Sequence, residues 1–477
     1  MQPTIGLEIH VELKTNSKMF CDCANDPSER HPNINVCPIC LGHPGVLPVI
    51  NQAAINMVIK AGLALNCQIA ENSHFDRKNY FYPDLPKGYQ ISQYYEPICR
   101  NGFLELEERK IKIREIHLEE DTGRLVHEKS HSLVDFNRAG VPLMELATDP
   151  DLKSAKEAKA FAEELRLIFW YLGISDADME KGQMRVEANI SVAKPGEKLG
   201  TKVEIKNLNS FKAVEKAIDY EIVRQAKVLE AGKKVIQETR GWDDAAGETV
   251  SQRTKEEAQD YRYFPEPDLP PLVFTGDQIR EIQASLPELP QARRLRLKKE
   301  YGLKDTEAEI FVKNKDFGEY FEKVVSELDP NLSQEKLSKL IKLASNYLIT
   351  DLQGLLKGAS VAGEDFLITP ENFAEFIALI NDGKLSSKMA KDVLAEMFRK
   401  GVDPSRIIDD RGFVQISDES EIRKIAKEVI AQNQKAVEDF KKGKENALQF
   451  LVGQVMAKTR GKANPETSRA VLLTELK

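Results

Sequence analysis

The hydrophobic pattern of this 477-residue chain changes near residue 290. Before that point, several short runs alternate apolar and polar residues, which is the period of a β-strand with one buried face. After it, apolar residues recur every three or four positions, as they do in amphipathic helices. The sequence therefore predicts an α+β N-terminal region with a mixed or antiparallel sheet, followed by all-α regions.

The N-terminal region also contains helical patterns between its strands. The strand-like runs are residues 5–13, 104–121, 183–193 and 202–207. The helical runs are residues 53–65 and 154–174. In the run 104–121 the apolar parity changes between Ile113 and Ile116, which predicts a β-bulge at Arg114–Glu115.

Two linkers are expected to divide the chain. Residues 264–274 are rich in proline and read as extended chain before a boundary near residue 290. Residues 401–420 read as a second linker, followed by helices over 421–442 and 446–458 and a turn over 459–466. The expected domains are 1–290, 291–405 and 406–477.

The composition is that of an ordinary globular protein, with 41% hydrophobic and 30% charged residues. No stretch is long and apolar enough to span a membrane, and a strand begins by residue 5, so no secretory leader is expected. We therefore expect a cytoplasmic protein with reduced cysteines. The net charge of −8 argues against a protein covered in basic surface.

The C-terminal segment has the opposite charge. Residues 421–477 hold 12 Lys and Arg against 7 Asp and Glu, a net charge of +5 within a chain of −8. A small basic helical module on an acidic body fits contact with a phosphate backbone. A solvated charged helix is the alternative interpretation.

Four strand-like runs place ionisable or amide side chains on a single face. The residues are Glu8, His10 and Glu12; His117, Glu119 and Asp121; Arg185, Glu187 and Asn189; and Lys202, Glu204 and Lys206. One such face is usually solvated. Four in one region predict a common sheet whose polar side lines a cavity, and carboxylates with an imidazole suit a hard cation such as Mg²⁺.

The cysteine spacing predicts a separate metal site. Cys21 and Cys23 form C-x-C, and Cys37 and Cys40 form C-x-x-C thirteen residues later, a spacing compatible with tetrahedral zinc. Four thiolate ligands leave no open position, so the expected role is structural, with free thiols in a loop as the alternative. No phosphate-binding loop is found, since residues 196–202 (GEKLGTK) do not fit the required spacing.

Taken together, the motifs resemble the B subunit of the tRNA-dependent amidotransferases over the whole chain. The segments that carry the resemblance are IGLEIHVEL (5–13), PGVLPVIN (44–51), RKNYFYPDLPKGYQISQ (77–93), HLEEDTG (117–123), DFNRAGVPLMEL (135–146), MRVEANIS (184–191), VEIKNLNS (203–210), DYRYFPEPDLPP (260–271) and LVGQVMAKTRGKANPE (451–466). The resemblance implies a cradle-shaped N-terminal domain, a helical domain and a small helical tail domain that binds tRNA.

The resemblance also implies the chemistry. The B subunit of this family uses ATP to phosphorylate the side-chain carboxylate of glutamyl-tRNA(Gln) or aspartyl-tRNA(Asn), and ammonia then displaces the phosphate. A separate amidase subunit frees the ammonia from glutamine, and a small third subunit ties the two together. Phosphoryl transfer depends mainly on metal positioning and charge stabilisation.

The family motifs are carried over residue by residue. Glu8, His10 and Glu119 match metal-binding positions, and Glu204 or Glu187 is expected to complete a magnesium site. Lys78, Asn79 and Tyr80 lie in a motif that is expected to line the exit of the ammonia tunnel.

Other interpretations remain open from the residues. The chain could be a tRNA-binding scaffold without chemistry, a zinc hydrolase, or a protein that uses free ammonia without an amidase. A site closed by four cysteines argues against the zinc hydrolase. The sequence does not decide between Gln-tRNA and Asn-tRNA as the product.

Overall fold

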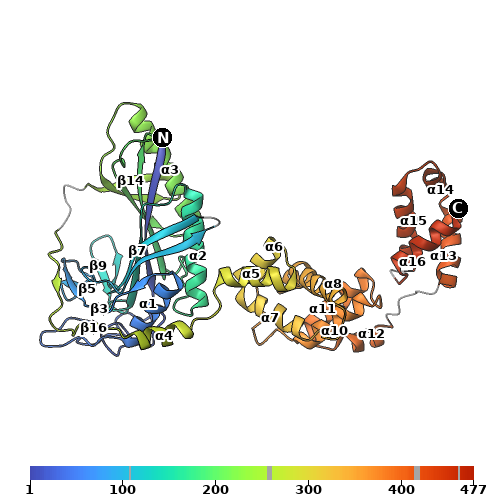
Figure 1. Cartoon of the computed structure of the whole chain (residues 1–477), viewed down its shortest axis with the longest axis horizontal. Coiled ribbons are helices and arrows are strands. Elements are labelled where there is room, and N and C mark those ends of the chain that lie inside the picture. Colours follow the sequence, from blue (N-terminus) through green and yellow to red (C-terminus); the bar gives the residue numbers. More distant parts are fainter. Residues whose placement is uncertain (107–108, 255–259, 413–418, 460–461, 477) are drawn as a thin grey trace. The chain divides into compact units, whose positions relative to one another are not determined.

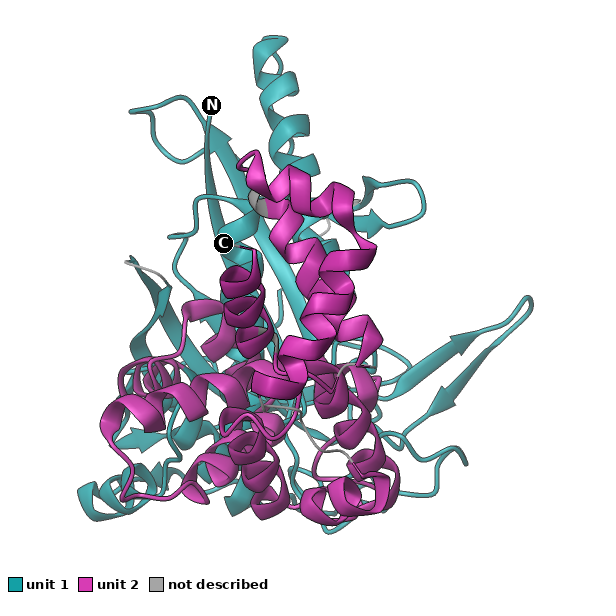
Figure 2. Cartoon of the chain, turned by 90° about the vertical axis from the view of Figure 1, so that its right-hand side faces the viewer, with its two compact units in different colours: residues 1–290 teal, residues 291–477 magenta. Residues whose placement is uncertain are grey.

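A computed structural model describes residues 1–106, 109–254, 260–412, 419–459 and 462–476 (Figure 1). The chain divides into two compact units, residues 1–290 and 291–477, which are coloured separately in Figure 2. Unit 1 contains all the strands of the described chain, and unit 2 is helical there. The predicted α+β region followed by helical regions is confirmed.

Unit 1 is built on a nine-stranded sheet in the order β14-β13-β12-β11-β1-β10-β7-β6-β2. Its strands are β1 (Gln2–Glu12), β2 (Gln68–Ile69), β6 (Cys99–Leu106), β7 (Arg109–Glu120), β10 (Pro142–Thr148), β11 (Met184–Ala193), β12 (Val203–Leu208), β13 (Glu238–Asp243) and β14 (Glu248–Thr254). All neighbours pair antiparallel except β12 and β13, which are parallel. The sheet is therefore mixed, and β1 lies at its centre.

Shorter strands form three small sheets beside the large one. Their orders are β15-β4-β5, β16-β3 and β8-β9. The strands are β3 (Asn72–Ser73), β4 (Asp76–Asn79), β5 (Tyr89–Ser92), β8 (Arg124–His127), β9 (Ser132–Asp135), β15 (Phe264–Pro265) and β16 (Leu272–Val273). Residues from 264 onward therefore return to pair with β3 and β4 near the start of the chain.

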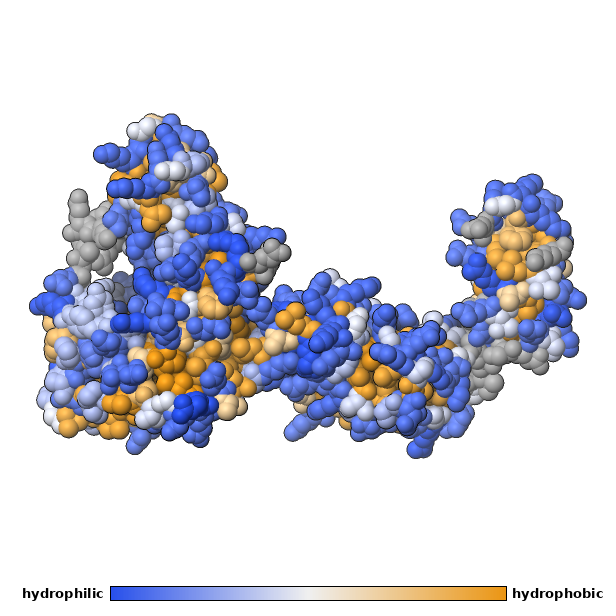
Figure 3. Space-filling view, in the orientation of Figure 1, coloured by the Kyte–Doolittle hydropathy of each residue, from blue (hydrophilic) through white to orange (hydrophobic). Residues whose placement is uncertain are grey.

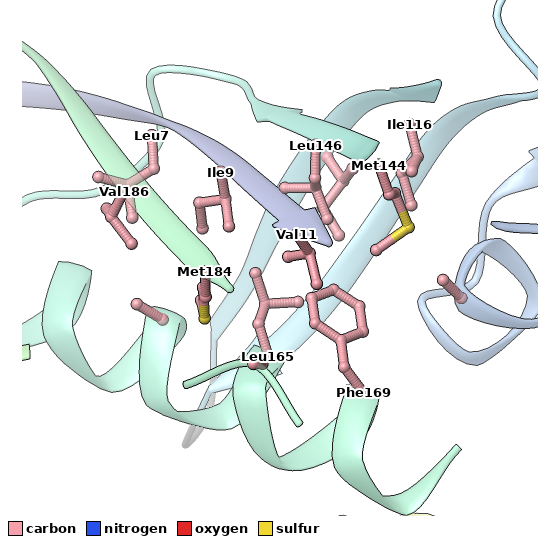
Figure 4. Close-up of a cluster of buried hydrophobic side chains, with 14 of the residues drawn as sticks. Leu7, Ile9, Val11, Ile116, Met144, Leu146, Leu165, Phe169, Met184 and Val186 are labelled. Carbon is pink, nitrogen blue, oxygen red and sulfur yellow. The ribbon is translucent and has the colours of Figure 1, made fainter. Parts of the chain in front are cut away.

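Helices pack on the apolar face of the large sheet. The helices of unit 1 are α1 (Gln52–Ala64), α2 (Ala155–Tyr171), α3 (Phe211–Glu230) and α4 (Gly276–Ala284). Figure 4 shows Leu165 and Phe169 of α2 directed at the inward-facing side chains of β1, β10 and β11, such as Val11 and Met184. Because successive strand residues point to opposite faces, this packing leaves Glu8 and His10 on the other side of the sheet.

The bulge expected in β7 is present. Glu115 pairs with Ala147 of β10, but the next partner, Thr148, pairs with Ile113, so Arg114 is the extra residue. The bulge keeps Ile113 and Ile116 on the same buried face. The run 104–121 is not one strand, because β6 ends at Leu106 and β7 begins at Arg109. Residues 107–108, between the two strands, lie outside the described chain.

Unit 2 is built from two groups of helices. Its first helices are α5 (Pro290–Tyr301), α6 (Asp305–Lys313), α7 (Lys315–Ser326), α8 (Gln334–Asn346), a π-helical segment (Tyr347–Leu352), α9 (Gln353–Leu356), α10 (Pro370–Asn381), α11 (Ser387–Lys400) and α12 (Pro404–Arg411). The tail holds α13 (Glu419–Gln432), α14 (Gln434–Lys441), α15 (Glu445–Lys458) and α16 (Pro465–Glu475). The tail helices share an apolar cluster made only of residues 422–476.

The structure corrects several sequence predictions in the helical part. The expected linker 401–420 contains helix α12, and its residues 413–418 lie outside the described chain. The expected helix 421–442 is divided at Asn433 into α13 and α14. The expected turn 459–466 includes residues 460–461, which are outside the described chain, and it leads into α16, a helix that the sequence analysis missed.

No helix in the described ranges is long and apolar enough to cross a membrane. In the view of Figure 3, hydrophilic side chains cover most of the visible face, with apolar patches between them. That distribution agrees with the high share of charged residues in the sequence.

Candidate active site

The polar face of the large sheet carries a row of four ionisable residues at its centre. His10 of β1 pairs with Glu145 of β10 on one side and with Arg185 of β11 on the other. Glu145 in turn pairs with His117 of β7. Directly opposed residues in a sheet have neighbouring side chains on one face. The register therefore places two imidazoles on either side of one carboxylate.

The side chains of this row are in close contact. Glu145 Oε2 lies 3.4 Å from Nε2 of His10 and 3.4 Å from Nε2 of His117. Nε2 of His10 is also 3.7 Å from Glu119 Oε1 and 3.9 Å from Glu8 Oε1. His10 is therefore surrounded by three carboxylates from three different strands.

A second acidic group lies one register step away, toward β12. Glu8 pairs directly with Glu187 of β11, and Glu204 of β12 lies beside them. Lys206 Nζ contacts Glu187 Oε2 at 2.8 Å and Glu204 Oε1 at 3.6 Å. Thr239 of β13 donates a hydrogen bond of 2.7 Å to Glu204 Oε2. Glu8 is the residue that the two acidic groups share.

The carboxylates hold the imidazoles in their charged form. Burial acts to lower the pKa of His10, but its hydrogen bond to Glu145 and the charges of Glu145, Glu119 and Glu8 outweigh this and raise the pKa to about 9. The pKa of His117 is raised in the same way, against the effect of burial, mainly by Glu145. The two imidazoles hold the pKa of Glu145 well below its ordinary value despite its burial.

The carboxyl groups differ in how readily they ionise. Burial, together with the charges of Glu145 and Glu187, raises the pKa of Glu8 to about 7. Although burial acts to raise the pKa of Glu204, the charge of Lys206 and the hydrogen bond from Thr239 lower it. Of these two carboxyl groups, Glu8 is therefore the one whose ionisation needs an additional positive charge nearby.

The donor set fits a divalent cation. Ligand atoms lie within 4.8 Å of one another in three groups, which are Glu8, His10 and Glu145; His117, Glu119 and Glu145; and Glu8, Glu187 and Glu204. Carboxylate oxygens with one or two imidazoles are a donor set for a hard or borderline divalent ion. The raised pKa of Glu8 reflects its burial first and the neighbouring negative charges second, and a bound cation would offset both.

Glu145 was missed by the sequence analysis, and it belongs to two of these three groups. On β10 its face also carries Leu143 and Ala147, so that face shows only a single polar position. The signal available was a lone carboxylate within an apolar run, PLMELAT. Its importance follows only from the pairing with β1 and β7, which is not local in sequence.

Two residues of the predicted polar faces have other partners. Asp121 accepts a hydrogen bond of 2.9 Å from Arg185 and lies 3.7 Å from Arg138, and it is in none of the three groups. Glu12 is buried beside Asp121, and burial and that neighbour raise its pKa to about 7. Neither side chain is solvated, and the two form a separate network next to the candidate metal ligands.

A cavity of about 630 Å³ opens over the acidic groups. It is lined by Glu8, His117, Glu145 and Glu204, and also by three basic residues: Lys202 just before β12, Lys206 on β12 and Arg114 of the bulge. Three tyrosines, Tyr94, Tyr261 and Tyr263, form part of its wall together with Lys78. The four predicted strands lie in one sheet, and polar residues of β1, β7 and β12 line this cavity, whereas Arg185, Glu187 and Asn189 of β11 do not.

The expected tunnel residues lie on and just after β4 at this wall. Lys78 lines the cavity and its Nζ is 5.2 Å from the centre of the Tyr261 ring. Asn79 donates through its side chain to the carbonyl of Arg262 at 2.9 Å. The Tyr80 ring packs edge-on against Tyr261 at 5.9 Å. The three residues therefore hold residues 261–262 at the cavity.

The four cysteines of the predicted zinc site come together, with all Sγ atoms within 4.8 Å of one another. The thiol of Cys21 hydrogen-bonds to Cys40, which lowers the pKa of Cys40 to about 5. Lys18 is fully buried, donates to the carbonyl oxygens of Asn35 and Phe136, and lies 3.9 Å from Cys40 Sγ. The donor set and its adjacent cation fit a tetrahedral thiolate site.

Comparison with known proteins decides the family. A family model described as the GatB/GatE catalytic domain matches residues 3–280, and a second, described as the GatB domain, matches residues 319–476. The chain belongs to the family of amidotransferase B subunits. All the residues of the candidate metal groups and of the cysteine cluster lie inside the region matched by the catalytic-domain model.

Curated relatives agree over the full length. The chain is 48% identical to the B subunit of the aspartyl/glutamyl-tRNA(Asn/Gln) amidotransferase of Carboxydothermus hydrogenoformans, covering 100% of this chain and 98% of the relative. It is 49% identical to the protein of the same description from Persephonella marina, with 100% and 99% coverage. It is 47% identical to that of Thermotoga sp. strain RQ2, with 99% and 98% coverage. The resemblance seen in the motifs is confirmed.

Proposed function

We propose that this chain activates and amidates the side-chain carboxylate of an amino acid carried by tRNA. The substrate is glutamyl-tRNA(Gln), aspartyl-tRNA(Asn) or both, and the products are the corresponding Gln-tRNA or Asn-tRNA, ADP and phosphate. The observation that carries the proposal is the group of carboxylates and imidazoles beside a large cavity, within the region matched by the catalytic-domain model.

The chemistry explains why such a site is needed. A carboxylate oxygen is a poor leaving group, so ammonia does not displace it. Attack of the carboxylate oxygen on the terminal phosphorus of ATP forms a C–O–P bond and breaks the bond to ADP. Ammonia then attacks the carbonyl carbon, phosphate leaves with the C–O bond electrons, and the new amide nitrogen loses a proton.

We propose that Glu8, His10 and Glu119, with Glu204 or Glu187 and with Glu145, hold magnesium beside the cavity, which Glu8, Glu145 and Glu204 line. A bound magnesium ion would supply positive charge for the ATP phosphates and the transferred phosphoryl group. The position of that ion would be set by the carboxylates that bind it. Lys206 orients two of them, those of Glu187 and Glu204. Ser92 donates to Glu119 at 3.4 Å.

The proposal includes partners. Each of the three relatives carries a name that describes one subunit of an amidotransferase, which supports a role for this chain within a larger enzyme. We propose an amidase partner that supplies ammonia and a small third partner that holds the two together, because the sequence of this chain offers no nucleophile motif for glutamine hydrolysis. The basic tail would bind the tRNA, and the reaction would take place in the cytoplasm, where aminoacyl-tRNA is used.

We also propose that Cys21, Cys23, Cys37 and Cys40 bind a structural zinc ion. Four thiolates complete a tetrahedral site and leave no position for a reacting water. We expect about one zinc per chain in the purified protein and loss of that zinc in Cys37→Ser. The same zinc content in the parent and in Cys37→Ser would contradict this assignment.

The experiment uses the protein assembled with its amidase and small partners, with magnesium, ATP, glutamine and glutamyl-tRNA. We expect Glu8→Gln to lower Gln-tRNA formation by on the order of 10²-fold or more, since it removes a charged group from the phosphoryl-transfer site. Glutamine hydrolysis and tRNA binding are expected to stay at the level of the parent.

Glu105→Gln, an exposed carboxylate on β6 outside the cavity, is the matched control and is expected to behave as the parent does. If Glu8→Gln amidates as fast as the parent, the polar face is not the metal site. If the parent binds tRNA but never consumes ATP in a tRNA-dependent way, the chain is a scaffold and the proposal is wrong.

A further inference from the structure

Lys78 is a cation held over the carboxylates by a small sheet. It lies on β4, where it pairs with Gln90 of β5. The side chain of Gln90 donates to the carbonyl of Glu120 at 2.7 Å, and the side chain of Gln93 accepts from the backbone N–H of Leu118 at 3.0 Å. These bonds tie β5, and with it β4, to the end of β7 that carries Glu119.

Aromatic side chains enclose Lys78 on the remaining side. Its Nζ lies over the ring of Tyr261, and the next residue, Asn79, is fixed because its backbone N–H donates to the carbonyl of Tyr261 at 2.9 Å. The ring of Tyr263 stacks on that of Tyr94 at a centroid distance of 4.2 Å and extends the wall. Lys78 therefore faces the cavity from a fixed position.

The side chain of Lys78 differs from those of Lys206 and Arg114 in its partners, and from that of Lys202 in being half-buried where Lys202 is exposed. Lys206 is paired with Glu187 and Glu204, and Arg114 with Glu115 at 3.4 Å. Within the described part of the chain, Lys78 has no side-chain hydrogen bond and no ion pair. Burial acts to lower the pKa of Lys78, yet the nearby Glu119, Tyr263 and Glu145 raise it, so the group stays protonated.

An ammonium that faces a cavity without an ion pair or a hydrogen bond, and with only the Tyr261 ring against it, is suited to bind an anion. It is poorly suited to accept a proton from ammonium, because a base must be a neutral amine. The anions brought into this cavity by the proposed reaction are the terminal phosphoryl group of ATP and the substrate carboxylate. Both carry negative charge during the transfer. In the transition state, negative charge is spread over the oxygens of the transferred phosphoryl group.

We propose that Lys78 is a catalytic residue that binds the transferred phosphoryl group and, after the transfer, the same group on the acyl phosphate. This inference rests on the proposed function and assigns Lys78 a role that differs from lining an ammonia tunnel. In the step concerned, the carboxylate oxygen forms a bond to phosphorus, the bond to the ADP oxygen breaks, and Lys78 keeps its proton throughout. Its contribution is charge and position alone.

The test compares Lys78→Met and Lys78→Arg in the assembled enzyme. Four rates are measured with glutamyl-tRNA: tRNA-dependent ADP formation, amidation with glutamine, amidation with added ammonium chloride, and glutamine hydrolysis. We expect Lys78→Met to lower the first three alike by on the order of 10²–10³-fold, as loss of one transition-state donor does. Glutamine hydrolysis is expected to be unchanged, and Lys78→Arg to recover part of the loss because it keeps the charge.

Lys110→Met is the matched control. Lys110 is exposed on β7 and also lies over an aromatic ring, that of Phe103 at 4.3 Å, but outside the cavity. It is expected to match the parent in all four rates. Lys78→Arg also serves as a folding control, because recovery of activity in this variant shows that position 78 tolerates substitution. If Lys78→Arg is folded but is as slow as Lys78→Met, a role based on charge is contradicted.

Three further results would overturn the inference. If Lys78→Met loses glutamine-dependent amidation but keeps ammonium-dependent amidation and ADP formation, Lys78 serves ammonia delivery. If all four rates match the parent, Lys78 has no role in the reaction. If the parent itself forms no ADP in response to glutamyl-tRNA, the proposed function fails, and the inference fails with it.

Discussion

At the scale of single residues, Glu145 determines the electrostatics of the site. It lies 3.4 Å from the Nε2 atoms of both His10 and His117, and it contributes to two of the three groups of candidate ligands. Glu8 and His10 were predictable because they alternate with apolar residues in one continuous strand. Glu145 was not, because Leu143 and Ala147 occupy the other positions on its face and its partners come from distant parts of the chain.

The charge on His10 should make the stability of the metal-free protein depend on pH. Its pKa is about 9 in the folded protein against an ordinary value of 6.5, so the protonated imidazole contributes its full stability below pH 6.5 and loses it as the pH rises through 9. We expect the free energy of unfolding by urea, measured in EDTA, to fall by about 1–3 kcal/mol over this range.

The variant Glu145→Gln tests the cause of that fall. Removing the carboxylate charge lowers the pKa of His10 in the folded protein, so the fall in the free energy of unfolding at alkaline pH should be smaller than in the parent. Urea unfolding of both proteins at several pH values measures the difference. An equal fall in the two proteins would show that Glu145 does not hold the charge on His10.

At the scale of secondary structure, local patterns predicted the strands that have one polar and one apolar face. They also predicted the bulge in β7, because an extra residue changes the apolar parity. Helix α3 was missed for a physical reason. Its buried stripe begins with Val214, Ala217 and Ile218 but continues with Glu221 and Gln225, where a helical pattern requires apolar residues.

Glu221 connects helix α3 to the edge of the sheet, and this connection can be tested. The side chain is fully buried, accepts hydrogen bonds from Arg224 and Gln225 on its own helix, and accepts one of 3.1 Å from Thr249 on β14. Removing one member of a buried charged network leaves its partners unsatisfied. We therefore expect Glu221→Ala to lower the free energy of unfolding by about 3–5 kcal/mol.

Denaturant unfolding of Glu230→Ala provides the comparison. Glu230 is the last residue of the same helix and is exposed, so its replacement should change the free energy of unfolding by less than about 0.5 kcal/mol. Similar values for the two variants would mean that the buried network does not hold α3 in place.

At the scale of the whole molecule, the histidines and cysteines lie in one part of the chain and the excess of basic residues lies in another. All seven histidines and all six cysteines lie in the first 131 residues, whereas residues 421–477 carry a net charge of +5. The tail also has its own apolar cluster. The sequence predicted this division because composition and charge can be counted along the chain. The pairing of β1, β7 and β10, which brings the candidate metal ligands together, joins distant parts of the chain and cannot be counted in this way.

The basic tail should contribute affinity for tRNA and leave the chemical step unchanged. We expect the double variant Lys441→Glu, Lys442→Glu to weaken tRNA binding about tenfold at low salt, with a smaller effect as salt is raised, because phosphate contacts release counterions. The amidation rate at saturating tRNA should match the parent. Filter binding at several salt concentrations, with amidation rates alongside, measures both.

A charge-matched control lies in unit 1. Lys110→Glu with Lys129→Glu makes the same change in net charge at exposed positions in the N-terminal unit. If this control weakens tRNA binding as much as the tail variant does, the effect is one of net charge and the tail has no special part in binding.

Isotope transfer provides the sharpest test of whether a carboxylate on tRNA is activated by phosphoryl transfer. Glutamyl-tRNA labelled with ¹⁸O in both side-chain carboxylate oxygens is amidated by the assembled enzyme with ATP and ammonium, and the released phosphate is analysed by mass spectrometry. We expect each phosphate to carry one ¹⁸O atom from the carboxylate, because the oxygen that attacks phosphorus leaves with it. Phosphate without the label, formed together with Gln-tRNA, would contradict this expectation.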